Sequence, residues 1–243
     1  MQATNNIYKE ILNTPGHKKE HRVFIGGIEQ KILKKAETRH RSIGSAPTVT
    51  GGLFGKSHPT VGNCVARQID LTVKPESEIP RMAEIRLETR LVLQTAGGET
   101  LTSEWLPKGT FYIDTRRKDV SSGALVIHGY DAMLKMEQTY IEDGADITGW
   151  PKSMNVVAAD IATLIGVEID ERSVLNANYM VEAPLGYTMR EVMGWIAAAH
   201  AGNWTITDAG KLRLVGLKVV ETSDTTSVLG IGVLGIMVLG NGG

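Results

Sequence analysis

His128 and Asp131 are the two residues of this sequence that could form a catalytic pair, because they lie close together on either side of Tyr130. A histidine beside a carboxylate can act as a general base with its orienting acid, but a hydrolytic triad also needs a nucleophile. No serine lies in a G-x-S-x-G elbow, since 120–123 (VSSG) lacks the first glycine. The single cysteine, Cys64, begins an amphipathic stretch, which favours a small core residue over a reactive thiol.

Metal and nucleotide motifs are incomplete in the same way. Among the six histidines only His17 and His21 are near neighbours, whereas a zinc site needs three or four ligands. Residues 55–57 (GKS) resemble the end of a phosphate-binding loop, but Thr50 stands where that motif has its first glycine. Pro59 would also block the helix that should follow. We therefore expect no catalytic, cofactor-binding or metal-binding residue, no cofactor and no enzymatic activity.

Charge and composition describe an ordinary globular chain. The 26 lysines and arginines nearly balance the 27 aspartates and glutamates, and 42% of the 243 residues are hydrophobic. This balance gives no bulk attraction to nucleic acid or to a membrane surface. A basic cluster at 31–41 contains no aromatic residue for base stacking, so a solvated face or a protein interface is favoured there over a phosphate site.

The first half of the chain has the alternation of antiparallel strands. Strands are expected at 110–116 and 124–130 around a polar turn, at 64–74, at 82–93 and at 101–106, which Pro107 should end. Arg67 is the one charged residue on the apolar side of 64–74. Residues 21–33 predict a hairpin with Gly26-Gly27 at its tip, and 7–13 a short helix. The pattern indicates an antiparallel β-barrel or sandwich.

The second half changes to a helical period. Asp131 should cap a helix through Met136, with Gly129 allowing the chain to turn into it. Ser153 should begin a second helix that buries Met154, Val157, Ile161, Leu164 and Ile165 and ends at Gly166. Residues 188–191 (TMRE) form a capping box for a third helix, with Tyr187 packing on Val192, and 204–207 and 211–215 predict a hairpin. The expected fold class is α+β, a β-barrel or sandwich followed by a small α/β domain.

Two further stretches have a distinctive composition. Residues 42–62 are rich in glycine, serine, threonine and proline and predict a long loop. Residues 228–239 (VLGIGVLGIMVL) are apolar but shorter than the roughly 20 residues of a membrane helix. A buried strand is favoured there over a membrane element, and an incomplete last domain is the third possibility.

Five segments in order resemble a known family: VGNCVARQIDLTV, IPRMAEIRLETRL, EWLPKGTFYIDTRR, LVIHGYDAMLKME and YTMREVMGWIAAAHAGNWTITDAGKLRLVGL. Together they span about 61–217 and resemble the hub region of tail proteins from long-tailed phages and prophages, which are related to the baseplate hub of contractile phages. The resemblance implies a structural virion protein that caps the tail tube at the tail tip.

In that family the hub is a homotrimer, with two barrel domains per chain and a small α/β domain between them. The resemblance implies that 1–130 form the first barrel and 131–215 the small α/β domain. Residues 216–243 would then be the start of a second barrel or a truncated tail. The implied partners are further copies of the chain and the distal tail, tail tube and tape measure proteins, with no specific nucleic acid and no membrane integration. The protein would be assembled in the host bacterial cytoplasm and reside in the virion.

Two other functions remain open at this point. A phage-tail peptidoglycan hydrolase would use His128 and Asp131. A carbohydrate-binding module would need a row of exposed aromatic residues, for which an aromatic content of 5% is low.

Overall fold

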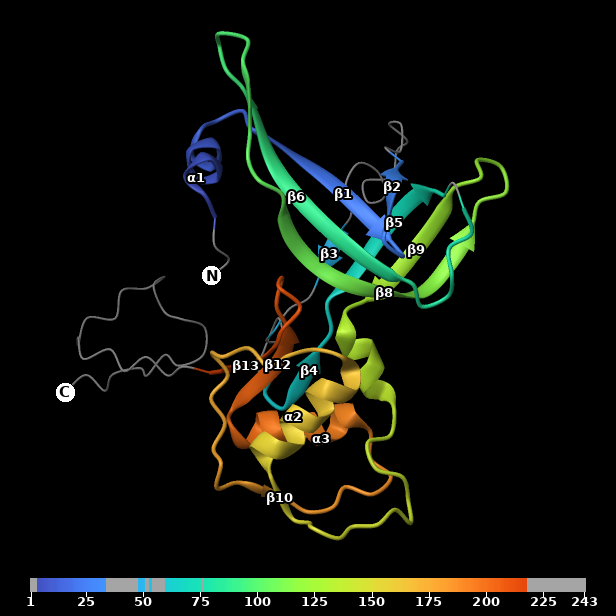
Figure 1. The fold of residues 1–243 in the computed structure, drawn as a ribbon, viewed down its shortest axis with the longest axis vertical. Helices are drawn as coiled ribbons and strands as arrows, with labels where there is room; N and C mark the ends of the chain where they lie inside the picture. The colour runs from blue at the N-terminus through green and yellow to red at the C-terminus, as the bar shows by residue number, and fades with distance from the viewer. Residues whose placement is uncertain (1–3, 34–47, 51–52, 54–59, 76, 218–243) are drawn as a thin grey trace, which may run out of the picture.

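The computed structural model describes residues 4–33, 48–50, 53, 60–75 and 77–217. They form two modules, which lie one above the other in Figure 1. The upper one consists of strands and is called the barrel here. The lower one contains the longer helices and a small sheet, and is called the helical module. The expected α+β class is confirmed.

The barrel is a closed ring of antiparallel strands in the order β1-β2-β5-β9-β8-β6, and β6 pairs back with β1. The ring strands are β1 (Lys18–Ile25), β2 (Ile28–Ile32), β5 (Gln68–Lys74), β6 (Glu84–Gln94), β8 (Leu106–Lys118) and β9 (Leu125–Tyr130). Two short strands add to it, since β3 (Thr48–Thr50) pairs with β5 and β7 (Thr100–Thr102) pairs with β6. Closing the sheet leaves it without the long open edges of a flat sheet.

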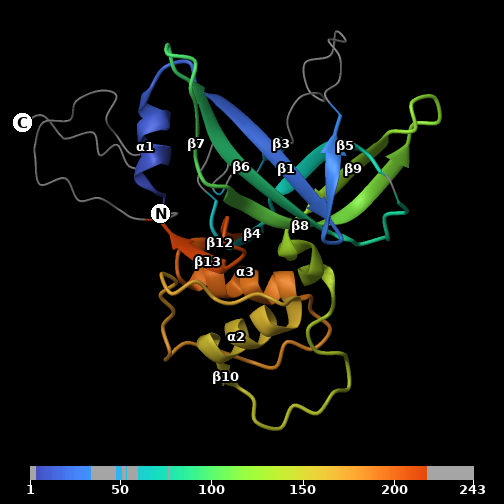
Figure 2. The ribbon, with the colours of Figure 1, turned by 45° about the horizontal axis from the view of Figure 1, so that its top comes forward.

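Alternating apolar residues close this ring around a core. Buried and less buried side chains alternate along β5 and β6, as the period of two requires. The fully buried members include Val23, Ile69, Val73, Ile85, Phe111 and Ile127. Helix α1 (Asn6–Asn13) packs Ile11 on Leu91 and Leu93, and Figure 2 shows this helix beside β6 and β7.

The helical module has its own core beneath the barrel. Its elements are the 3₁₀ helix η1 (Ala132–Glu137), α2 (Met154–Ile165), α3 (Met189–Ala199), the hairpin β12 (Gly202–Ile206) and β13 (Leu212–Gly216), and the short strands β4 (Asn63–Val65), β10 (Lys152–Ser153) and β11 (Met180–Val181). β4 lies parallel to β12 in a three-stranded sheet. Trp204 is fully buried there and donates its indole N–H to the Met193 carbonyl at 3.0 Å.

The local signals for turns and helix ends are largely confirmed. Gly26 and Gly27 both have positive φ at the tip of the β1–β2 hairpin. Gly166 ends α2 in the left-handed conformation at φ 77°. The capping box of Thr188 and Glu191 opens α3. The hairpin around 208–210 and the helix at 7–13 are also present.

Several boundaries differ from the prediction. Residues 64–74 are not one strand, because β4 and β5 belong to different sheets and the chain crosses between the modules at Ala66-Arg67. The strand expected at 101–106 ends at Thr102. Pro107 lies inside β8 beside a register shift, a place where a strand tolerates a missing N–H.

Three helix details also need correction. Asp131 is an N-cap as predicted, but it opens a 3₁₀ rather than an α-helix. Ser153 occupies the N-cap of α2 without a side-chain capping bond, and Leu164 is 58% exposed instead of buried. A contact that was not predicted joins Tyr187 to the ring of Trp195 in α3, edge-on and with 4.8 Å between the ring centres.

The two stretches of distinctive composition lie mainly outside the described residues. Strand β3 occupies part of the loop expected at 42–62, so that expectation was wrong for 48–50. The apolar segment at 228–239 and the GKS triplet lie beyond the described ranges, as does most of the basic cluster at 31–41. Among the described residues, no helix is long and apolar enough to span a membrane.

Candidate functional site: the module junction and the barrel face

The structure does not bring His128 and Asp131 together. His128 lies on β9 with its Nδ1 2.7 Å from Oδ1 of Asp70 on the neighbouring β5, and its ring packs edge-on against Tyr130. Asp131 instead accepts two backbone hydrogen bonds, from the N–H of Arg67 at 2.9 Å and of Met133 at 3.0 Å. The carboxylate beside His128 therefore belongs to Asp70 on β5, and not to Asp131 as predicted.

The other candidate groups occupy structural positions. Cys64 is buried in the helical module, and burial raises the pKa of its thiol to about 12, so it is protonated at neutral pH. His17 and His21 have separate partners, the Thr14 carbonyl and the Thr89 hydroxyl, each at 2.9 Å. Across the described ranges, no three histidine, cysteine, aspartate or glutamate side chains are grouped so that they could hold a metal ion.

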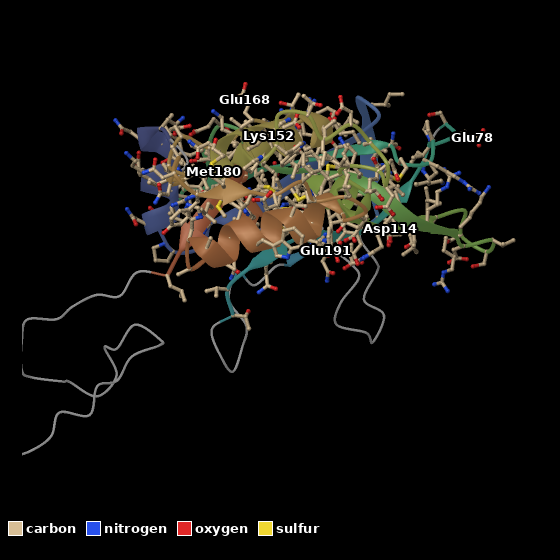
Figure 3. All side chains as sticks on the ribbon, turned by 90° about the horizontal axis from the view of Figure 1, so that it is seen from below. Glu78, Asp114, Lys152, Glu168, Met180 and Glu191 are labelled. Carbon is tan, nitrogen blue, oxygen red and sulfur yellow. The ribbon has the colours of Figure 1, made fainter. Side chains whose placement is uncertain are left out.

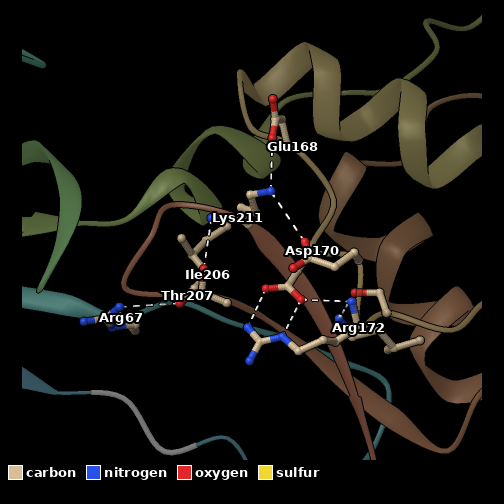
Figure 4. A network of polar contacts seen from close by, with 10 residues as sticks. Arg67, Glu168, Asp170, Arg172, Ile206, Thr207 and Lys211 are labelled. Carbon is tan, nitrogen blue, oxygen red and sulfur yellow. Dashed lines mark hydrogen bonds and ion pairs between the residues drawn. The ribbon is translucent and has the colours of Figure 1, made fainter. Parts of the chain in front are cut away.

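Arg67 is the residue that joins the two modules. Its guanidinium donates to the Lys108 carbonyl of β8 at 2.7 Å and pairs with Asp208 of the β12–β13 hairpin at 2.9 Å. It also lies over the Phe111 ring, 5.5 Å from the ring centre. Figure 4 shows it directed at the carbonyl of Ile206. The charged residue on the apolar side of the predicted strand is thus a bridge between the barrel and the small sheet.

Asp131 links two of the places where the chain passes between the modules, the crossing at Ala66-Arg67 and the step from β9 to η1. Its side chain accepts from the Arg67 N–H, while its own N–H donates to the Arg67 carbonyl at 3.0 Å. Burial raises the pKa of Asp131 to about 6, although the two backbone N–H donors and the charges of Arg67 and Arg190 act in the opposite direction. A buried carboxylate at this position is held by hydrogen bonds and requires them.

Arg190 of α3 makes the matching connection inside the helical module. Its guanidinium donates to the carbonyls of Cys64 in β4 and Met133 in η1, and pairs with Glu137 at 2.5 Å. Two elements, β4 and η1, are thereby fixed to one helix that is distant from both in sequence. Arginine suits this role because its planar fork can reach several acceptors at once.

A second polar network fixes the outer end of the helical module. Asp170 receives two contacts from the Arg172 guanidinium, at 2.7 and 2.5 Å, and the pKa of Asp170 is held well below its usual range mainly by these bonds. Lys211 pairs with Glu168 and Glu171 at 3.3 and 3.5 Å (Figure 4). These contacts hold the segment after α2 against the β12–β13 hairpin, where Leu212 accepts from the Asp170 N–H. The network is structural.

The outer wall of the barrel carries a row of stacked arginines and aromatic rings, which we call the arginine–aromatic face. Arg22 lies 5.2 Å from the ring centre of Phe24 and 4.4 Å from that of Trp105. Arg86 also lies over the Phe24 ring, 4.6 Å from its centre, and Arg90 lies over Trp105 at the same distance. Stacks of this kind hold long side chains in a fixed geometry.

Two glutamates complete the arginine–aromatic face. Glu88 pairs with Arg22 at 2.5 Å, and Glu20 pairs with Arg90 at 2.7 Å. The pairs are direct neighbours across β1 and β6, as the register Arg22↔Glu88 and Glu20↔Arg90 shows. Other charged groups are spread over both modules, as in Figure 3 with Glu78 and Asp114 on the barrel and Glu191 on α3. The face thus combines groups suited to a protein interface with two glutamates that pair with Arg22 and Arg90 of its three arginines.

The fold defines a class: a closed antiparallel barrel whose chain runs through a compact α+β module. Among solved structures, the chain is similar to the 43 kDa tail protein of prophage MuSo2 from Shewanella oneidensis, at 14% identity and a TM-score of 0.53. That match covers 83% of this chain and 56% of the tail protein. A second similarity is to the tail protein from Neisseria meningitidis MC58, at 14% identity and a TM-score of 0.48, covering 81% of this chain and 51% of that one.

The chain therefore has the fold of a prophage tail protein, and it spans only about half the length of the proteins it matches. No family model matches the sequence, and no curated protein matches it. The expected resemblance to phage tail proteins is confirmed at the level of fold.

Proposed function

We propose that this protein is a structural component of a phage or prophage tail, and that it acts as the hub at the tail tip or baseplate. The observation that carries the proposal is the fold, a closed barrel interlocked with a helical module, which it shares with a prophage tail protein. In this role the chain forms a homotrimer that caps the tail tube and docks the distal tail, tube and tape measure proteins. Most of residues 1–130 then serve as the first barrel, and residues 131–215, together with strand β4, serve as the small α/β domain.

The arginine–aromatic face supports an assembly role. Arginine, tryptophan and other aromatic side chains are enriched at the centres of protein interfaces, where their rigid groups contribute most of the binding energy. Trp105 contacts the guanidinium groups of both Arg22 and Arg90, which restrict its side chain before a partner binds. Less side-chain freedom then remains to be lost on binding.

The experiment is the oligomeric state of the full chain, followed by binding to its tail partners. Light scattering should give the mass of a trimer, and negative-stain images of the particle should place the protein on a three-fold axis below the tube. Trp105→Ala should shift the trimer toward monomer, while Trp150→Ala, in the helical module, serves as the matched control. A protein that stays monomeric at high concentration and binds neither tube nor distal tail protein would contradict the proposal.

A further inference from the structure

Strand β1 is paired along its whole length on one side only. Toward β6 its register runs from Lys18↔Val92 to Ile25↔Ile85 without interruption. Toward β2 it runs only from Val23↔Gln30 to Ile25↔Ile28, because β2 then turns to pair with β5. Residues 18–22 of β1 are left as an open strand edge in the barrel wall, and no other described strand pairs with them.

The direction of the backbone groups along this edge follows from the register. The N–H of Gly26 donates to the carbonyl of Glu84 in the β6 direction, and in an antiparallel pair successive residues direct their backbone groups to opposite sides. Lys19 and His21 therefore direct their N–H and C=O groups away from β6, toward the open edge. Within the described ranges no backbone bond satisfies these four groups. These N–H and C=O groups have the spacing that pairs with an added strand.

The edge borders a recess of about 350 Å³, lined by residues 19–22 of β1, residues 29–32 of β2 and Trp105. Gln30 is one of its lining residues and is only 6% exposed. None of the described residues donates a hydrogen bond to the Oε1 atom of Gln30. A buried amide oxygen without a donor is costly, and a partner that brings a donor into the recess removes that cost.

Charge determines which strand fits. Glu20 and Arg22 are already neutralised, by Arg90 and Glu88. The remaining charged residues at the edge and the recess are Lys18, Lys19, Lys31 and Glu29, and within the described part of the chain none of them has an ion pair. The edge and the recess therefore carry three unpaired lysines and one unpaired glutamate within the described residues. Lysines on an open edge oppose pairing with neutral or basic strands, but they attract an acidic one.

We propose that this open edge of β1 binds an extended acidic segment of a partner protein, which adds to the barrel wall as a further strand. The partner's backbone pairs with Lys19 and His21, and its carboxylates lie against the lysines. This inference goes beyond the hub assignment, because it rests on the unpaired backbone groups of Lys19 and His21 and not on the arginine–aromatic face, although Trp105 borders both surfaces. If the peptide does not bind, the proposed trimer is unaffected. If the protein is a monomer, the proposed binding edge is unaffected.

The test uses the full chain and a blocked eight-residue peptide of alternating glutamate and valine. A lysine–valine peptide of the same length is the charge-reversed control. In two-dimensional NMR, the acidic peptide should shift the amide signals of Lys19 and His21 and slow their hydrogen exchange at least tenfold. The basic peptide should bind at least tenfold more weakly. No binding at millimolar peptide, shifts confined to other strands, or equal binding of both peptides would overturn the proposal.

Two variants separate backbone pairing from general charge attraction. Lys19→Pro removes one outward N–H at an edge position that tolerates proline. This variant should bind the acidic peptide at least tenfold more weakly. If that variant does not fold, the double variant Lys19→Glu with Lys31→Glu should have the same effect. The double variant Arg117→Glu with Lys118→Glu, at the far end of β8, changes the net charge as much as Lys19→Glu with Lys31→Glu does and should leave binding unchanged. If a higher protein concentration alone slows hydrogen exchange of the same amides, a second copy of the chain occupies the edge. That result would overturn the proposal.

Discussion

Replacing Arg67 by alanine should loosen the junction between the two modules. The substitution removes an ion pair to Asp208, whose side chain is 36% exposed, so that pair contributes at most about 1 kcal/mol. It also removes the charged donor to the Lys108 carbonyl at 2.7 Å, worth about 1.5–3 kcal/mol. The contact to Ile206 at 3.5 Å is too long to add much. We expect the free energy of unfolding to fall by about 2–4 kcal/mol.

Urea unfolding followed by tryptophan fluorescence and circular dichroism measures this loss. Arg67→Lys keeps the charge but not the fork, and should recover about half of it. Arg117→Ala is the matched control, because Arg117 is exposed at the end of β8, and surface changes usually stay within about 0.5 kcal/mol. If Arg67→Ala costs no more than Arg117→Ala, Arg67 is not the bridge described above.

The remaining predictions concern Gly129, Asp131 and His128. Gly129→Ala should destabilise the barrel by about 1–3 kcal/mol in thermal unfolding, because the added carbon would lie 2.5 Å from the Tyr112 carbonyl oxygen; an unchanged melting temperature contradicts this. The folded-state pKa of Asp131 is raised, so the folded protein holds this proton more tightly than the unfolded chain, and stability falls as pH rises from about 4 to 6. Relative to Asp131→Asn, urea unfolding should show a loss on the order of 2 kcal/mol over that range, and a flat or rising difference refutes it. Wild type and His128→Ala should both leave purified peptidoglycan intact, and turbidity loss in the wild type that disappears in the variant would restore the hydrolase.

Local patterns predicted the elements well because each depends on near neighbours in sequence. The alternation in β6, the two glycines of the β1–β2 turn and the capping box of α3 all follow from spacing and side-chain chemistry. Gly129 was predicted correctly to have a backbone role, but the predicted reason, a turn into the following helix, was wrong. It lies within β9 and is needed for the close approach of the Tyr112 carbonyl, which depends on a strand pairing that the sequence does not display.

The junction and the barrel face could not be predicted, because both depend on contacts between distant segments. The signal for Arg67 was present as a charge on an apolar side, but its partners Lys108 and Asp208 lie 41 and more residues away. The same holds for His128, whose carboxylate partner is 58 residues distant. The arginine–aromatic face likewise needs the β1–β6 register, since Arg22 and Glu88 are 66 residues apart.

The chain crosses between barrel and helical module at Ala66-Arg67 and again at Asp131, and these two crossings are bonded to each other. The Asp131 N–H donates to the Arg67 carbonyl, and the Arg67 N–H donates to the Asp131 carboxylate. A tensile force applied to the helical module would therefore be shared by these two connections, because the hydrogen bonds between Arg67 and Asp131 tie one to the other.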